Sequence, residues 1–330
     1  MRSRRSRLAA IGLGSVLTLG VAGYAGAGLY VLQTGTHLEG GCHSEHAAFT
    51  PAGWSNQVWV SSDFAPTLDA APYFMPEYQH VSFPSRGDTR LTIDGWLIPA
   101  ETAGAPTVIV VHGQGSCKRD PAILMPAAML HRQGFGVLMI DMRDSGDSST
   151  EDGRYGAGSD EFRDVLGAWD WLVAGGIAPQ RIGLFGQSGG AAAIMVAMGE
   201  EPRVAAGWEE SGFTDMAVLV KEELRRMGFP EFLAPAGTLW AQAFGDDFVR
   251  RSPLAELKRI GTRPFQVVHG SHDQRVNVHH AMDAEAVLKV ANPSASAWLI
   301  PDGEHVQGPF LVPDEYEARL GTFFHAALGN

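Results

Sequence analysis

A serine in a glycine-rich turn is the strongest chemical signal in the sequence. Residues 186–190, GQSGG, form the only G-x-S-x-G in the chain; they follow the apolar run Ile182–Phe185 and open an alanine-rich stretch. Strand, tight turn and helix in this order present a serine hydroxyl as a nucleophile, because the residues beside it must lack bulk. The helix would also point its positive end at negative charge forming near the hydroxyl. We interpret Ser188 as a candidate nucleophile, supported by Gly186 and Gly190; a turn without chemistry is the alternative.

An acid and a histidine follow the serine in the required order. A serine hydroxyl is a weak nucleophile and needs a base, which is itself oriented by an acid. On this kind of sheet the chain order is serine, acid, histidine. Asp273 follows the apolar run Phe265–Val268, and His305 follows the last such run in the chain. We predict that Ser188, Asp273 and His305 form a catalytic triad that works through an acyl-enzyme.

Other histidines and acids could compete for these roles. His269 and His272 are rival bases, but both stand in the loop that carries the acid. Asp246 and Asp247 are rival acids, but they lie in a predicted insertion. Position at a strand end therefore favours His305 and Asp273.

A second glycine-rich turn could stabilise an oxyanion. The turn His112–Gly115 follows a short β-branched run. A turn there can aim one backbone N–H at the oxyanion, and the residue after the nucleophile can supply another. We nominate the amides of Gln114 and Gly189 as the oxyanion hole, with Gly113 as motif support. We interpret His112 as a structural histidine that braces the turn, although it could be mistaken for a base.

Alternating strands and helices must position these loops. Short apolar runs are typical of buried strands, and the stretches between them are typical of helices. The alternation predicts an α/β fold with a mostly parallel eight-stranded sheet, helices on both faces, and reactive loops at the carboxyl ends of the strands. The predicted strands, the first two forming an antiparallel hairpin, are Val81–Pro84, Leu91–Ile98, Thr107–Val111, Gly136–Ile140, Arg181–Phe185, Val204–Trp208, Pro264–Val268 and Ala297–Ile300. The predicted helices are Ala122–Gln133, Asp160–Ala174, Ala191–Met198, His279–Val290 and Asp314–Leu328.

Taken together, these motifs resemble the α/β-hydrolase superfamily, in particular the single-span bacterial hydrolases related to the serine aminopeptidase-like and ABHD-type groups. The resemblance covers about residues 78–328 and also rests on Asp94–Leu97, Asp141–Ser148, Asp273–Val276 and Gly303–His305. Asp144 departs from the family's D-x-R-G-x-G-x-S pattern, which usually has glycine there. The resemblance implies an α/β-hydrolase fold and acyl chemistry, but no particular substrate.

A helical insertion at about residues 211–262 resembles the cap of this superfamily. An apolar cap would favour acyl or aromatic substrate groups; alternatively, its apolar residues only bury one another. These residues are Leu219, Leu224, Met227, Phe229, Phe232, Leu239, Trp240, Phe244 and Phe248. Cys117, which follows the oxyanion turn, is interpreted as an inert thiol, although it could line the cleft.

The amino end is predicted to be a membrane anchor. Residues 1–7 are basic, and residues 8–32 carry no charged side chain. A helix of 25 residues measures about 37 Å, which exceeds the roughly 30 Å of a hydrocarbon core. The basic flank predicts a single pass with residues 78–330, the hydrolase domain, outside. The alternative is a signal peptide cleaved near Ala25–Ala27, which would release the domain.

Residues 33–77 are predicted to be a linker without regular structure. The linker contains potential metal ligands at close spacing, but a solvated spacer is the favoured interpretation because no paired metal motif is present. The potential ligands are Glu39, Cys42, His43, Glu45 and His46. Two cysteines, Cys42 and Cys117, cannot form a disulfide framework and leave the redox environment open.

Composition excludes several other functions. Of 330 residues, 45% are hydrophobic and 19% are charged, which is enough for a large core and excludes a disordered chain. The net charge of −12 disfavours nucleic acid, because binding phosphates requires Lys and Arg. No P-loop, HExxH or EF-hand pattern occurs, and a glycine pair at residues 12–14 lies in the predicted anchor. We expect neither a cofactor nor a metal.

The expected function is a membrane-tethered serine hydrolase for carboxylic esters or thioesters, with a small acyl ester or a short peptide as substrate. A peptidase or amidase with the same triad is the main alternative. We expect no upstream propeller domain, which disfavours an oligopeptidase. An acyltransferase, or a catalytically silent binding protein on the same fold, is less expected, because all three triad members are present. No oligomeric state is predicted.

Overall fold

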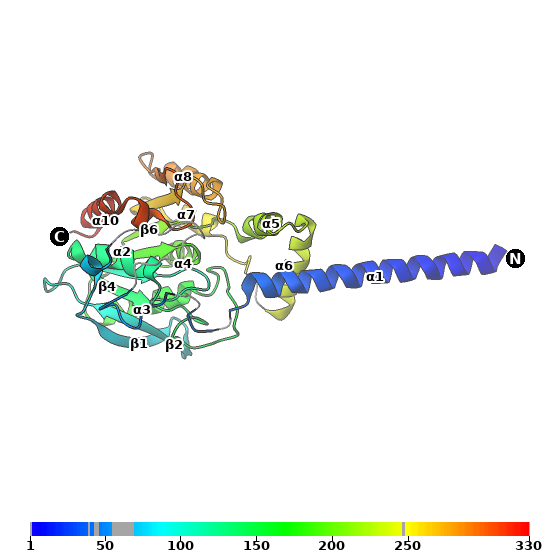
Figure 1. The fold of residues 1–330 in the computed structure, drawn as a ribbon, viewed down its shortest axis with the longest axis horizontal. Helices are drawn as coiled ribbons and strands as arrows, with labels where there is room; N and C mark the ends of the chain where they lie inside the picture. Colours follow the sequence, from blue (N-terminus) through cyan, green and yellow to red (C-terminus); the bar gives the residue numbers. More distant parts are fainter. Residues whose placement is uncertain (1, 39, 43–45, 55–68, 246–247, 330) are drawn as a thin grey trace.

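A single sheet organises the main body of the protein. The computed structural model describes residues 2–38, 40–42, 46–54, 69–245 and 248–329, with the backbone alone for 2–14 and 16. In Figure 1, a layered body surrounds this sheet, and the amino-terminal helix α1 projects from it. The described strands follow the order β1-β2-β4-β3-β5-β6-β7-β8. Their bounds are β1 Gln79–Ser85, β2 Asp88–Ile98, β3 Thr107–Val111, β4 Gly136–Ile140, β5 Ile182–Gln187, β6 Ala206–Glu210, β7 Phe265–Gly270 and β8 Ala297–Ile300.

The pairing of the strands confirms the predicted mostly parallel eight-stranded sheet. β2 pairs antiparallel with β1 and β4, and all later neighbours pair in parallel. Every residue of β3 and β4 is buried, which explains their continuous apolar sequences. β3 lies beside β5, with Val111 opposite Gly186. Because parallel strands end at the same edge, the turn after β3 lies next to the G-x-S-x-G turn after β5.

Helices cover both faces of the sheet, as predicted. Buried side chains of α2 and α10 pack on one face, and those of α3, α4, α7 and α8 pack on the other. The bounds are α2 Pro121–Arg132, α3 Phe162–Ala174, α4 Gly189–Glu200, α7 Pro253–Ile260, α8 His279–Ala291, α9 Gly308–Leu311 and α10 Pro313–Leu328.

Two helices between β6 and β7 stand apart from the sheet. They are α5, Met216–Arg226, and α6, Ala234–Phe244, joined through a short turn at Glu231–Leu233. We call α5 and α6 the cap. Figure 1 shows the cap beside the carboxyl-terminal part of α1, whereas α7 returns to the body. The predicted insertion at 211–262 therefore contains the cap and one body helix.

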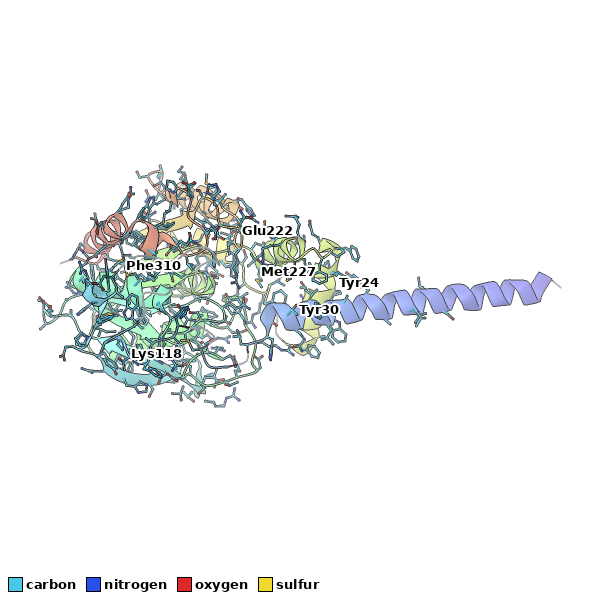
Figure 2. All side chains as sticks on the ribbon, viewed as in Figure 1. Tyr24, Tyr30, Lys118, Glu222, Met227 and Phe310 are labelled. Atoms are coloured by element: carbon cyan, nitrogen blue, oxygen red, sulfur yellow. A yellow bond between two sulfur atoms is a disulfide. The ribbon has the colours of Figure 1, made fainter. Side chains whose placement is uncertain are left out.

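The amino-terminal helix α1, Arg2–Thr36, packs against the cap. A Cβ atom at Gly28 would collide with Ala236 of α6, so glycine permits this close approach. The indole N–H of Trp240 donates to the Ala25 carbonyl at 2.7 Å. Tyr24 and Tyr30, both labelled in Figure 2, lie on this part of α1, and the Tyr24 hydroxyl donates to the Phe232 carbonyl at 2.9 Å.

The predicted membrane anchor is contradicted. Among the helices that the structure describes, none combines the length and the apolar character needed to cross a bilayer. The prediction relied on the absence of charged residues over 8–32. A membrane-spanning helix must also be strongly apolar, and absence of charge does not ensure this. The sequence of α1 has glycine at positions 12, 14, 20, 23, 26, 28 and 35, and glycine contributes no apolar side chain.

Part of the predicted linker packs against the body. Leu38, Ala48 and Trp54 are buried, and the Leu38 amide donates to the Gly153 carbonyl at 2.7 Å. A disulfide joins Cys42 to Cys117, so neither is the free thiol that the sequence suggested for Cys117. Glu39, His43 and Glu45 lie outside the described residues.

The loop after β4 shows how Asp144 replaces the usual glycine. Asp144 adopts φ +59°, a left-handed conformation that favours glycine and that aspartate tolerates better than most residues. Its carboxylate accepts hydrogen bonds from the amides of Glu151 and Gly153 at 2.8 and 2.9 Å. These bonds hold the loop in the conformation that glycine would otherwise allow.

Candidate active site

The G-x-S-x-G turn places its serine in a strained conformation. Ser188 lies between β5 and α4 with φ 52° and ψ −116°, outside the regions that L-residues favour. The flanking glycines are required sterically. A Cβ atom at Gly186 would lie 2.5 Å from the Gly190 carbonyl oxygen, and one at Gly190 would collide with the backbone of Val111 and His112.

The structure brings the three predicted catalytic residues together. The Nε2 atom of His305 lies 2.9 Å from the Ser188 Oγ, and its Nδ1 atom lies 2.8 Å from Oδ2 of Asp273. The other carboxylate oxygen of Asp273 accepts from the amides of Arg275 and Val276 at 2.9 and 2.8 Å. The Ser188 hydroxyl thus contacts an imidazole, and the far side of that imidazole contacts a carboxylate that two backbone amides orient.

Asp273 is held in its ionised form. Burial alone would raise the pKa of this carboxyl group. The neighbouring His305 and His269 rings and the Val276 amide outweigh that effect, and the pKa is lowered. Asp273 therefore presents a negative charge to His305 at neutral pH.

The rival histidines make other contacts. His269 is buried, and its Nε2 atom lies 2.8 Å from the Val276 carbonyl oxygen and 3.4 Å from the Asp273 carboxylate. Burial lowers the pKa of His269, which favours the neutral ring. The side chain of His272 is 61% exposed and lies near Asp302. The rival acids Asp246 and Asp247 are outside the described residues.

The predicted oxyanion donors lie next to each other. A Cβ atom at Gly189 would be 2.9 Å from the Gln114 backbone nitrogen, so these two backbones lie close together, and both residues line the cavity at Ser188. Gly113 is packed against the serine, because a Cβ atom there would lie 3.1 Å from the Ser188 Cβ. The side-chain amide of Gln114 donates to the Gly35 carbonyl at 2.9 Å, which ties this turn to α1.

His112 lies within the turn and is fully buried. Its Nδ1 atom is 2.7 Å from the Gly113 carbonyl oxygen, and its Nε2 atom accepts from the Met142 amide at 3.0 Å. Burial lowers the pKa of His112. The ring therefore connects the turn after β3 with the segment after β4.

Tyr155 is a site residue that sequence reasoning missed. Its hydroxyl is buried without a hydrogen-bond partner among the described residues. A Cβ atom at Gly189 would lie 2.5 Å from that hydroxyl oxygen, so the hydroxyl packs closely on Gly189, and Tyr155 lines the cavity at Ser188. Burial and the nearby Glu161 raise the pKa of Tyr155 well above its ordinary value, so the phenol keeps its proton. No local motif marks this tyrosine.

An apolar cavity opens at Ser188. Its volume is about 240 Å³, and α1, the cap and the loops of the body all contribute to its wall. The main apolar lining residues are Val31, Leu32, Phe213, Met216, Leu219, Val220, Leu224, Met227, Phe248 and Val276. This contribution of α1 was not predicted, because residues 8–32 were interpreted as a membrane anchor.

The apolar residues of the predicted insertion at 211–262 divide between two environments. Leu219, Leu224 and Phe248 are buried and line the cavity. Phe229, Phe232, Leu239 and Phe244 are exposed, near α1 or on the outer surface. Only the first group could contact a substrate in the cavity, and the second group is not buried.

Two buried glutamates on β6 lie behind the nucleophile. Glu210 accepts from the Gln187 side chain and the Tyr316 hydroxyl, both at 2.8 Å, and from the Gly308 amide at 2.9 Å. Burial raises the pKa of Glu209 to about 8 and also raises that of Glu210. This network links the end of β5 to the segment after His305, and nothing in the local sequence indicated it.

The buried Lys118 connects two motifs that carry the family resemblance, Asp94–Leu97 and Asp141–Ser148. The Nζ atom of Lys118 lies 2.7 Å from Asp94, 2.5 Å from Asp141 and 2.8 Å from Asp147. Lys118, labelled in Figure 2, is fully buried. These carboxylates could suggest a metal site, but the ammonium group already occupies their centre.

We expect Lys118→Met to lower the free energy of unfolding by about 3–5 kcal/mol, because it leaves buried carboxylates without a cation. Urea denaturation followed by circular dichroism measures the change. Arg90→Met is the matched control: Arg90 pairs with Asp88 at the surface, so little change is expected. Equal stabilities of Lys118→Met and the unmodified chain would contradict a structural role for this cluster.

Comparison with known proteins identifies the family. The model of the prolyl oligopeptidase family matches residues 125–330, more than half of the chain. The chain belongs to this family and is therefore a hydrolase of the α/β-hydrolase superfamily. It is 26% identical to the uncharacterized protein YfhR of Escherichia coli K12 over 255 residues, 76% of this chain and 81% of the relative. It is 22% identical to acylamino-acid-releasing enzyme 1 of rice, over 77% of this chain and 35% of that enzyme.

Solved structures confirm the predicted fold. The esterase Pf2001 of Pyrococcus furiosus superposes with a TM-score of 0.62 and 23% identity, covering 80% of this chain and 97% of the esterase. A puromycin-hydrolyzing peptidase of Mycobacterium tuberculosis gives a TM-score of 0.61 and 20% identity, over 80% of this chain and 41% of the peptidase. At these identities the likeness establishes the α/β-hydrolase fold alone.

Proposed function

We propose that the protein is a serine hydrolase that cleaves carboxylic esters or thioesters with small apolar acyl groups. The observation that carries this proposal is the hydrogen-bonded series Ser188–His305–Asp273 at the wall of an apolar cavity. The amides of Gln114 and Gly189 beside the serine support acyl transfer, because they can bind the oxyanion of a tetrahedral intermediate.

The proposed mechanism uses only groups of this chain and water. His305 Nε2 takes the proton of the Ser188 hydroxyl as its oxygen attacks the substrate carbonyl. Asp273 stabilises the imidazolium, which then gives the proton to the leaving alcohol or thiol. Water, activated by the same ring, attacks the acyl-enzyme, and the acid and the free serine are released.

The cavity favours an ester over a peptide with a free amino terminus. Such a peptide carries an ammonium group that needs an unpaired carboxylate. Glu223 is the single carboxylate among the described lining residues, and it already pairs with Arg226 at 2.7 Å. The remaining lining is mainly apolar and suits an acyl chain. A peptidase is the second candidate, favoured by the family and by the names of two of the relatives above.

Parallel assays of esters and amides test the proposal. The purified full chain is given p-nitrophenyl esters of increasing acyl length, matched p-nitroanilides of amino acids and N-acetyl amino acids, and Ser188→Ala as the background control. We expect kcat/KM for the best ester to exceed that for every anilide, with a maximum at short or medium acyl length. Preferred cleavage of an anilide would favour the peptidase. Transfer of the acyl group to added alcohols would favour an acyltransferase.

We also propose the Tyr155 hydroxyl as a third oxyanion donor, because it is unpartnered among the described residues and lies close to Gly189. Tyr155→Phe is then expected to lower kcat by about a hundredfold with little change in KM, because it removes this donor and keeps the ring. Steady-state kinetics on the best ester measures the effect. Tyr78→Phe is the matched control, since Tyr78 packs against Trp96 outside the cavity lining. An unchanged kcat in Tyr155→Phe would remove this hydroxyl from the oxyanion site.

Leu32→Ala is expected to shift the preferred acyl group toward longer chains and to change the ratio of kcat/KM for long and short esters several-fold. Leu32 is buried on α1 and lines the cavity, so its truncation enlarges the space for the substrate. Leu17→Ala, on the exposed part of the same helix, serves as the control. The same chain-length profile in both variants would exclude α1 as a determinant of specificity.

A further inference from the structure

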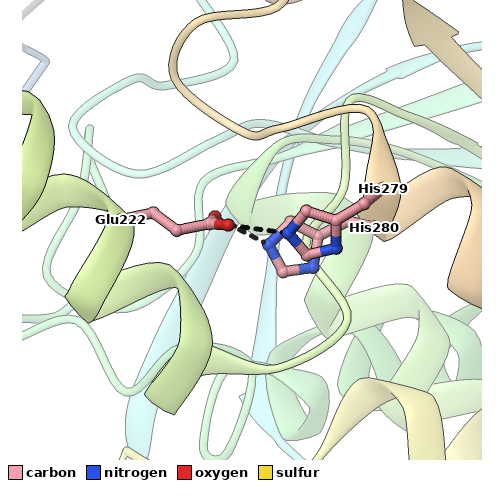
Figure 3. A group of neighbouring side chains, drawn as sticks. All are labelled: Glu222, His279 and His280. Carbon is pink, nitrogen blue, oxygen red and sulfur yellow. Dashed lines mark hydrogen bonds and ion pairs between the residues drawn. The ribbon is translucent and has the colours of Figure 1, made fainter.

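A cluster of two histidines and a glutamate joins the cap to the body. Glu222 extends from the cap helix α5, and His279 and His280 begin the body helix α8 (Figure 3). The Nε2 atoms of both rings face the carboxylate, at 2.7 Å for His279 and 3.2 Å for His280. The Nε2 atoms of the two rings thus contact the two oxygens of one carboxylate.

The spacing of these atoms is close to that of metal ligands. The three ligand atoms lie within 4.8 Å of one another. Zn²⁺ with bonds of about 2.0–2.1 Å in a tetrahedral arrangement separates its ligands by about 3.3 Å. The His280–Glu222 pair is already near that separation, and the His279–Glu222 pair would open by about half an ångström.

The outer nitrogen of each ring has an oxygen partner that can accept the proton of a metal-bound imidazole. The Nδ1 atom of His279 lies 3.2 Å from the carboxylate of Asp283. The Nδ1 atom of His280 lies 2.8 Å from the Thr214 hydroxyl and also accepts from the Thr214 amide at 3.2 Å. With a metal on Nε2, the ring proton of His280 moves to Nδ1 and is donated to that hydroxyl, and the bond from the Thr214 amide is lost. Such contacts orient metal-bound imidazoles.

One side of the cluster is buried, and the other side is open to solvent. His280 is buried and the Glu222 side chain is 11% exposed, whereas the His279 side chain is 44% exposed. An ion could enter beside His279 and keep a water molecule as its fourth ligand. This cluster differs from the aspartate cluster around Lys118. Among the described contacts, no lysine or arginine lies between Glu222 and the two rings.

We propose that Glu222, His279 and His280 form a binding site for a divalent transition-metal ion, with Zn²⁺ as the expected ion. Two imidazole nitrogens and one carboxylate favour Zn²⁺ over Mg²⁺ or Ca²⁺, which prefer oxygen ligands. The ion joins α5 to α8. Because Leu219, Val220 and Glu223 of the same α5 helix line the cavity, it fixes the cap wall of the candidate active site.

Isothermal titration calorimetry with Zn²⁺ tests this site on the full chain after treatment with a chelator. We expect one ion per chain with micromolar or tighter affinity, and no displacement by Mg²⁺. Glu222→Gln and His279→Gln should each weaken binding at least about tenfold, and Asp283→Asn should weaken it by about the same factor. The titration is repeated with His305→Ala, which removes the active-site imidazole as a competing ligand.

His80→Gln is the matched control, since His80 also pairs with a carboxylate, Asp94, but has no second histidine beside it in the described pairs. It should leave Zn²⁺ affinity unchanged. Co²⁺ provides a second measurement that needs no variant: visible absorption bands of a four-coordinate ion should appear and be removed by Zn²⁺. The proposal is overturned if the folded chain binds no Zn²⁺, or if Glu222→Gln and His279→Gln leave the affinity unchanged.

Discussion

Replacing His305 by alanine is expected to lower kcat by about six orders of magnitude, the loss typical of removing the base of a serine triad. The reason lies in the 2.9 Å contact between its Nε2 atom and the Ser188 hydroxyl. Without this ring, the hydroxyl keeps its proton through the attack. Activity on the best ester is measured with enough enzyme to detect turnover near the background rate.

The control for this variant is His272→Ala. His272 is a rival histidine of the neighbouring loop, and its side chain is largely exposed. We expect its kcat to stay within a few-fold of the unmodified chain. A loss below tenfold in His305→Ala, with the thermal unfolding curve unchanged, would mean that His305 is not the base.

Asp273→Asn is expected to lower kcat by about ten-thousandfold. An amide group facing Nδ1 of His305 favours the tautomer that carries its proton on Nε2, and that nitrogen can no longer accept the serine proton. The other oxygen of residue 273 still accepts from the Arg275 and Val276 amides, so the loop should keep its conformation. Steady-state kinetics together with thermal unfolding separates loss of catalysis from loss of fold.

Asp302→Asn is the matched control for this second prediction. Asp302 is an exposed acid in the loop before His305, and it lies 3.4 Å from His272. Its replacement should change kcat little. If Asp273→Asn retained a tenth or more of the activity, another group would have to orient the imidazole.

The sheet and the arrangement around Ser188 could be predicted because their signals are local. Each buried strand is a short apolar run, and each candidate residue follows one of these runs. The motif also has glycine at positions 186 and 190, and the structure leaves no room for a side chain at either position. The parallel order of the strands then brings Ser188, Asp273 and His305 to one edge of the sheet.

Features formed by distant segments could not be predicted in the same way. The cluster of Glu222 and His279 joins residues 57 positions apart, and the disulfide joins residues 75 positions apart. Nothing in the sequence near Tyr155 indicates that its hydroxyl lies against Gly189. The amino-terminal segment was misinterpreted because lack of charge was taken as a sign of a membrane helix.

The central claim is that Ser188 is an activated nucleophile in a pocket formed by this chain. The most direct test is to treat the folded full chain with a fluorophosphonate and locate the adduct by peptide mass spectrometry. We predict one adduct per chain, on Ser188, that is lost in Ser188→Ala and forms far more slowly in His305→Ala. An adduct on another residue, or no adduct on a folded chain, would contradict the claim.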